Sequence, residues 1–96
     1  MEKQPCVYML ASRKNGTLYI GVTSNLPQRI AQHKVGDIPG FARKHGVTRL
    51  VWFEPHETMD NAITREKQMK KWNRAWKIRE IMRSNPEWDD LSAEIG

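Results

Sequence analysis

Hydrophobic and polar residues alternate in two short segments near the N-terminus, residues 5–11 and residues 18–23. Alternation with a period of two predicts strands, because successive side chains of a strand point to opposite faces. Between the two segments lies Asn15-Gly16, the dipeptide that most strongly indicates a tight hairpin turn. The sequence therefore predicts an antiparallel hairpin. One face of this hairpin is apolar and carries Val7, Met9, Ala11, Leu18, Ile20 and Val22.

The opposite face of the predicted hairpin carries one tyrosine from each strand. A loop of two or four residues places Tyr8 and Tyr19 on the same face, whereas a three-residue loop separates them unless a bulge resets the register. Gly21 belongs to this face too and leaves space there. We therefore expect the first face to be core, and the second face to offer two phenols beside a glycine.

After the hairpin, the chain carries the signals of one helix and a third strand. Asn25 is typical of an N-cap and Pro27 of a first helical turn, which predicts a helix to about Val35. Residues 36–46 contain a break rich in glycine and proline, followed by a basic loop. Residues 47–54 are β-branched and aromatic and therefore predict a third strand.

Two further helices are predicted in the C-terminal half. Thr58 indicates the start of a helix over residues 59–71, and Asn73 the start of another to about Arg83, unless the two run on with a bend. The resulting order is ββαβαα. It predicts an α/β chain of the α+β type, with a small three-stranded antiparallel sheet flanked by helices.

The length of 96 residues is sufficient for one domain with a modest core. We assign this domain to residues 1–86 and expect residues 87–96 to form an acidic tail, partly packed on the domain through Trp88 and Leu91. The single cysteine excludes an internal disulfide, and the N-terminus has no long apolar run typical of a signal peptide or membrane span. These features predict a cytoplasmic protein.

The charge balance is basic, with 16 lysine and arginine residues against 11 aspartate and glutamate residues and a net charge of +5. Such a balance favours polyanionic partners such as nucleic acid or an anionic membrane, although a solvated surface can also be basic without them. The candidates for phosphate contacts are Arg43, Lys44, Lys67, Lys70, Lys71 and Arg74. Trp72 and Trp76 lie among them, and we expect these rings to anchor helices to the sheet rather than to stack bases.

Arg29 and His33 are four residues apart and therefore share one face of the first predicted helix. An arginine fork suits a phosphate and the charge that develops on it during hydrolysis. A histidine beside it can donate or accept a proton near neutral pH. The alternative is an exposed helix face with an ordinary arginine and histidine.

Glu66 falls inside an apolar arc of the second predicted helix, the arc formed by Met59, Ala62, Ile63 and Met69. A carboxylate is costly to bury unless it is paired or binds a metal. Two interpretations follow. Glu66 is either a ligand of Mg²⁺, which prefers oxygen and often takes few ligands from the protein, or a core-edge glutamate paired with Arg29 or Lys70.

The segments Cys6-Val7-Tyr8 and Tyr19-Ile20-Gly21, followed by Arg29, His33 and Arg65-Glu66-Lys67, resemble the GIY-YIG nuclease domain, and most of all its small single-domain bacterial members. The resemblance implies a metal-dependent phosphodiesterase of the GIY-YIG fold that acts on nucleic acid. It implies that Glu66 holds Mg²⁺ or Mn²⁺ and that Arg29 stabilises the phosphate. Tyr8, or a water that it orients, would transfer the proton, and Tyr19 and His33 would assist.

Two positions depart from the family pattern. Cys6 stands where the first motif has glycine, which a strand tolerates, and the asparagine that usually follows the metal glutamate has only Asn73 and Asn85 as candidates, neither at a matching spacing. In larger members of the family an added DNA-recognition domain selects the substrate, and we expect no such second domain here. We therefore expect an endonuclease selective for structure rather than sequence, acting on DNA more than on RNA. The alternatives are a binding module that holds nucleic acid without cutting it, and a protein whose basic face docks an acidic partner.

Overall fold

The computed structural model describes residues 4–36, 40 and 45–95. Its strands are β1 (Cys6–Ala11), β2 (Leu18–Thr23) and β3 (Arg49–Pro55), which form one antiparallel sheet in the order β2-β1-β3. Its helices are α1 (Leu26–Lys34), α3 (Met59–Lys70), α4 (Arg74–Ser84) and a short 3₁₀ helix, η1 (Leu91–Glu94). The predicted α+β class, the order ββαβαα and the three-stranded antiparallel sheet are confirmed.

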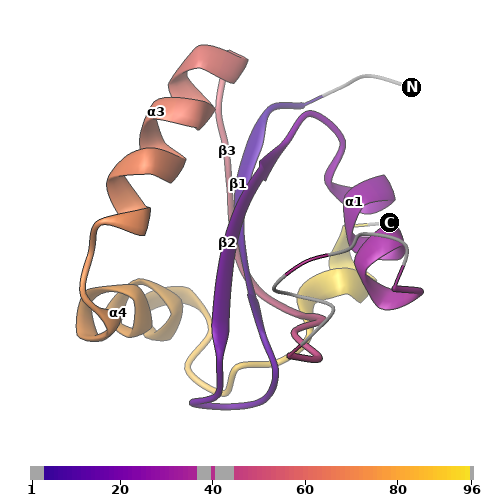
Figure 1. Ribbon diagram of the computed structural model, residues 1–96, viewed down its shortest axis with the longest axis vertical. Helices are drawn as coiled ribbons and strands as arrows, with labels where there is room; N and C mark the ends of the chain where they lie inside the picture. The colour runs from indigo at the N-terminus through magenta and orange to yellow at the C-terminus, as the bar shows by residue number, and fades with distance from the viewer. Residues whose placement is uncertain (1–3, 37–39, 41–44, 96) are drawn as a thin grey trace.

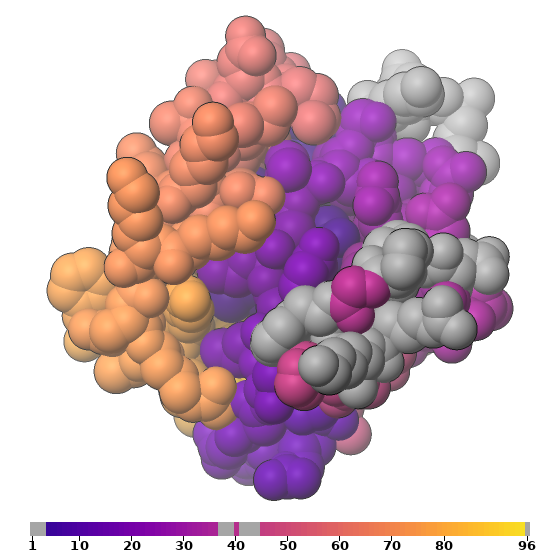
Figure 2. All heavy atoms as spheres, viewed as in Figure 1, coloured from indigo at the N-terminus to yellow at the C-terminus, as the bar shows by residue number. Residues whose placement is uncertain are grey.

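The sheet carries a helical layer on each face (Figure 1). Helices α3 and α4 cover one face, while α1 and the C-terminal segment that contains η1 lie on the other. Strand β2 is an edge strand and lies between α1 and α3 in this view. The space-filling view shows α3 in orange and α1 in purple to magenta on the two sides of β2 (Figure 2). No helix of the described residues is both long and apolar enough to cross a membrane.

The helix starts lie where the capping residues predict them. The side-chain oxygens of Asn25, Thr58 and Asn73 accept hydrogen bonds from backbone N–H groups three residues later, at 3.3, 3.1 and 2.9 Å. Each cap satisfies one of the N–H groups that a helix start leaves without an intrahelical partner. Because Asn73 caps α4, the segment forms two helices rather than one bent helix.

The hairpin register confirms the predicted faces. Tyr8 pairs with Gly21, and Leu10 pairs with Tyr19, so that both tyrosines lie on one face of the sheet. The turn closes with a hydrogen bond of 2.9 Å from the Gly16 N–H to the Arg13 carbonyl. Asn15 has a φ of 60°, a left-handed conformation that asparagine tolerates better than most residues.

The second face of the hairpin differs from the expectation, because it is a core as well. All six residues of β1 are buried, since β1 is the central strand and both of its faces are covered. The core on the α3 side contains Val7, Met9, Ile20, Val51, Trp52, Ala62, Met69, Ile81 and Trp88. The core on the α1 side contains Cys6, Tyr8, Leu10, Leu26, Ile30, Val47 and Leu50. Tyr8 is therefore an interior residue at the base of the site.

The segment after α4 is tied into both cores. Trp88 is fully buried in the core on the α3 side, while Leu91 and Ile95 pack against the core on the α1 side. Asp90 Oδ2 accepts a hydrogen bond of 2.7 Å from Lys34 at the end of α1, and its Oδ1 accepts one of 3.3 Å from the Leu50 N–H of β3. This carboxylate therefore fixes the end of α1 to the sheet.

Candidate active site

The Tyr8 side chain extends from β1 across the neighbouring strand, β2. Tyr8 is 1% exposed, and its ring lies over Gly21 of β2. A Cβ atom on Gly21 would stand 2.5 Å from Cζ and 2.9 Å from Cε1 of Tyr8, closer than such atoms ever approach. Gly21 is thus required because it leaves the space that the phenol fills, rather than for a special backbone conformation.

His33 meets this phenol from the other side. This residue is 4% exposed, and its Nε2 lies 3.1 Å from the Tyr8 hydroxyl oxygen. The three rings form one cluster, with centroid separations of 6.3 Å between Tyr8 and Tyr19, 5.9 Å between Tyr8 and His33, and 5.5 Å between Tyr19 and His33. The cluster joins β1, β2 and α1, and Leu26 and Ile30 bury the same face of α1 as His33.

The protonation states in this cluster follow from burial and from Arg29. Burial lowers the pKa of His33 and the nearby Arg29 charge lowers it further, so the imidazole is neutral at pH 7. Burial also raises the pKa of Tyr8, and the neighbouring Tyr19 and Glu66 act in the same direction, while Arg29 opposes them. Tyr8 is therefore a phenol at pH 7, and its O–H can donate to Nε2 of His33 when the imidazole carries its proton on Nδ1.

Arg29 and Glu66 approach the phenol from different helices. Arg29 is half-buried on α1, and its charge acts on both Tyr8 and His33. Glu66 belongs to α3, across β2 from α1, and its side chain is 13% exposed. Its carboxylate lies 3.3 Å from the ammonium of Lys70, whose side chain is 55% exposed. Of the two pairings considered for Glu66, the structure therefore has the one with Lys70.

The oxygens available here suit a hard divalent cation. The described residues contain no cluster of three or more His, Cys, Asp or Glu side chains that could hold a metal ion. Mg²⁺ commonly takes one or two protein carboxylates and completes its octahedron with water and substrate phosphate. One carboxylate at the rim of a phenol-lined site fits that pattern, whereas zinc sites need three or four protein ligands.

The predicted phosphate contacts differ in what surrounds them. Lys67 and Lys70 are exposed on the second half of α3, and Lys71 is exposed at its C-cap. Arg74 donates from Nη2 to the carbonyl oxygens of Asn15 at 2.8 Å and of Gly16 at 2.7 Å, and so joins α4 to the hairpin turn. The other two candidates, Arg43 and Lys44, lie outside the described residues.

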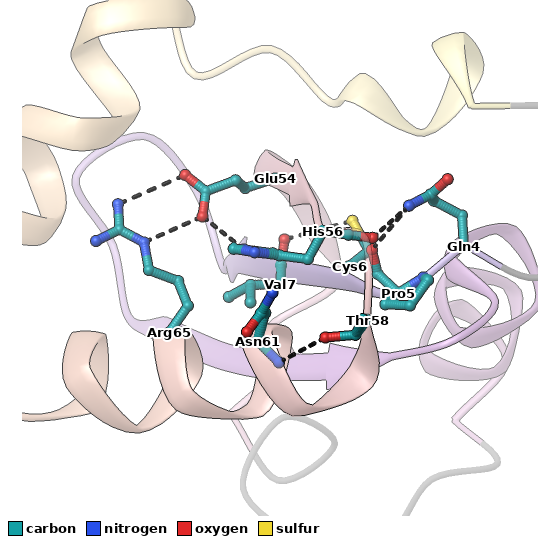
Figure 3. Close-up of polar contacts among 9 residues, drawn as sticks. All are labelled: Gln4, Pro5, Cys6, Val7, Glu54, His56, Thr58, Asn61 and Arg65. Carbon is teal, nitrogen blue, oxygen red and sulfur yellow. Dashed lines mark hydrogen bonds and ion pairs between the residues drawn. The ribbon is translucent and has the colours of Figure 1, made fainter.

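Arg65 has a structural setting that the sequence did not reveal. Its Nε donates to Oε1 of Glu54 at 3.0 Å, and Nε2 of His56 lies 2.7 Å from the same oxygen (Figure 3). The guanidinium also stands 5.1 Å from the ring centroid of Trp72. Sequence reasoning missed this cluster because it joins the C-terminal end of β3 and the residue after it to α3, and no pattern within one element records such a contact.

The positions that depart from the family pattern have structural roles. Cys6 is a buried strand residue, and burial raises the pKa of its thiol to about 11, which makes it unreactive. Asn73 caps α4, and Asn85 donates from Nδ2 to the carbonyl of Val51 at 3.1 Å. Val51 is the extra residue where β3 shifts its register against β1. Both asparagines are engaged in holding the fold.

Comparison with known proteins places this geometry in a family. Residues 4–79 match the family described as the GIY-YIG catalytic domain. A UPF0213 protein of Clostridium perfringens is 35% identical over 89 residues, which cover 93% of this chain and 95% of that protein. A UPF0213 protein of Natronomonas pharaonis is 36% identical over 73 residues, covering 76% and 85%. The solution NMR structure of a UPF0213 protein from Bacillus halodurans matches with a TM-score of 0.56 and 25% identity, covering 92% of this chain and 93% of that one.

Proposed function

This chain belongs to the GIY-YIG catalytic domain family, as its two tyrosine segments indicated, and we propose that it is a divalent-metal-dependent endonuclease. The substrate would be nucleic acid, DNA more than RNA, and the reaction hydrolysis of a phosphodiester bond. The observation that carries the proposal is the contact of 3.1 Å between Tyr8 and His33, two buried polar groups. Arg29 and Glu66 lie at the rim of the same site. The four residues therefore include a pair that can transfer a proton, a cation that can bind phosphate and a carboxylate that can hold a metal.

Each residue of the site would have a separate role in the reaction. Glu66 would hold Mg²⁺ or Mn²⁺, which when bound supplies positive charge to the scissile phosphate and acidifies water. Arg29 would bind a phosphate oxygen and stabilise the charge that builds on it. Tyr8 would take the proton of the attacking water while its own proton passes to His33, which is neutral at pH 7 and can accept it. Tyr19 would pack against the histidine and help to hold the water.

One observation favours the alternative of a binding module without catalysis. The Lys70 ammonium lies beside the Glu66 carboxylate and would compete with a metal ion for this carboxylate. The Lys70 side of this pair is mostly exposed, however, and an ion pair with a solvated partner is typically worth about 1 kcal/mol or less. We therefore propose that Lys70 turns away to a substrate phosphate when a metal binds.

A substrate panel tests the proposal. The purified chain is incubated with single-stranded, duplex and branched DNA and RNA, with Mg²⁺ or Mn²⁺ and with EDTA instead. We expect cleavage that requires the metal and is lost in Glu66→Gln. Glu57→Gln removes an exposed carboxylate from the loop before α3 and serves as the matched control. Binding without cleavage of any substrate in either metal would establish the alternative.

A further inference from the structure

Helix α4 carries an exposed aromatic surface beside two arginines. Trp76 is 50% exposed, which is unusual for so large an apolar side chain. The expectation that both tryptophans anchor helices therefore holds for Trp72, which packs against the core on the α3 side, and fails for Trp76. Together with Trp72, Arg79, Glu80 and Arg83, the Trp76 ring lines a shallow hollow of about 310 Å³. We call these five residues the α4 platform.

The Trp76 ring is held in place although it is exposed. It stands edge-to-face against Trp72, with ring centroids 6.2 Å apart and an interplanar angle of 77°. Trp72 in turn is half-buried, and Arg65 lies over its ring. A ring fixed in this way loses little freedom when a flat ligand stacks on it, which lowers the entropic cost of binding.

The charge around the ring indicates the class of ligand. Arg79 and Arg83 are exposed, and Glu80 is largely buried and lies 3.5 Å from Arg83. The hollow therefore carries a net positive charge beside an aromatic face. This combination suits an unpaired nucleotide, whose base stacks on the indole while its phosphate meets a guanidinium.

The platform is continuous with the basic end of α3. Lys70, which pairs with Glu66 at the candidate active site, and Lys71 are exposed, and Trp72 follows them directly in the chain. Helices α3 and α4 cover the same face of the sheet (Figure 1). A strand held at the active site can thus continue along these cations toward Trp76.

We propose that the α4 platform is a second nucleic-acid site that stacks an unpaired base of a strand whose phosphodiester lies at the active site. This rests on the proposed function for its substrate class. It implies that the preferred nucleic acid has a single-stranded segment next to the bond that is cut.

Binding is measured by fluorescence anisotropy, in EDTA, with labelled oligo(dT) and with the same strand annealed to oligo(dA). We expect Trp76→Ala to weaken binding of the single strand by about 5- to 150-fold, the range for losing one base stack, and to change duplex binding less than about twofold. Arg79→Gln should weaken binding more than Arg13→Gln, which removes one exposed cation at the hairpin turn. Thermal melting checks that each variant is folded.

Three results would overturn the platform: unchanged binding by Trp76→Ala, an equal loss on single strand and duplex, or equal effects of the two arginine variants. Because EDTA removes catalysis from the measurement, the outcome is independent of cleavage. A chain that binds the single strand through Trp76 but never cuts would contradict the proposed endonuclease and retain the platform.

Discussion

The packing of Tyr8 over Gly21 leads to a strong prediction for Gly21→Ala. The added methyl carbon would stand 2.5 Å from Cζ and 2.9 Å from Cε1 of Tyr8, a residue that is 1% exposed and whose ring cannot swing into solvent. Overpacking of a closed interior destabilises the fold by about 1–3 kcal/mol. Replacing glycine also lowers the entropy of the unfolded chain, which stabilises the fold by about 0.4–1 kcal/mol. Because the contacts lie well below 3.0 Å, we take the upper half of the overpacking range, about 2–3 kcal/mol, and expect a net loss of unfolding free energy of about 1–2.6 kcal/mol.

The consequence for activity should exceed the consequence for stability, since the displaced ring is the one that contacts His33. A loss of about 1 kcal/mol lowers the melting temperature of a domain of this size by about 4–8 °C. Cleavage measured well below that temperature should nevertheless fall by at least about tenfold, because a displacement of about 1 Å at a reacting group is that costly. Gly16→Ala is the matched control, as it crowds Ser12 and Arg13 in the same hairpin without touching the site.

A double-mutant cycle isolates the contact itself. Tyr8→Leu shortens the side chain that the added methyl group on β2 would meet, so the two substitutions together should cost less in unfolding free energy than the sum of the single changes. Strictly additive costs, or a Gly21→Ala protein with the melting temperature and cleavage rate of the parent, would refute the packing argument.

Further substitutions test the other groups of the site and the C-terminal attachment. Arg29→Ala should lower the single-turnover cleavage rate by about 10²–10³-fold, the scale of losing one group that stabilises the transition state. Glu66→Gln should abolish metal-dependent cleavage yet change the unfolding free energy without metal by less than about 1 kcal/mol, because its partner Lys70 is exposed; a loss of about 3–5 kcal/mol would instead make the pair a buried structural one. Burial alone would raise the pKa of Asp90, but hydrogen bonds from Lys34 and Ser92 outweigh it and hold this pKa at about 2, below the ordinary 3.8. The stability from Asp90 is therefore present above about pH 4 and lost as the pH falls toward 2, and the melting temperature of Asp90→Asn should approach that of the parent in this window.

The hairpin and its two tyrosines were predictable from the sequence because they depend on local rules. Alternation assigns residues to faces, and the Asn15-Gly16 turn sets an even register, which together put Tyr8 and Tyr19 on one face. The capping residues Asn25, Thr58 and Asn73 fixed the helix starts for the same reason. Each of these signals acts within a few residues of the chain.

The rest depends on contacts between distant segments, which no local pattern records. That the tyrosine face is a second core follows from its cover by α1 and the C-terminal segment. At the β3 bulge, the Val51 carbonyl accepts a hydrogen bond from Asn85, which lies 34 residues later in the chain. The exposure of Trp76 was missed because the presence of a tryptophan in a helical segment does not indicate whether its ring faces the sheet or the solvent.

We propose that Tyr8 transfers the proton in a metal-dependent cleavage. The direct measurement is single-turnover cleavage by the parent and by Tyr8→Phe, with Mg²⁺, on one substrate whose binding is measured in parallel in EDTA. Phenylalanine keeps the ring over Gly21 and removes only the hydroxyl that lies 3.1 Å from His33. We predict a rate lower by about 10²–10⁴-fold with binding unchanged within about twofold. A Tyr8→Phe protein that cuts as fast as the parent would show that the Tyr8 hydroxyl takes no part in the cleavage.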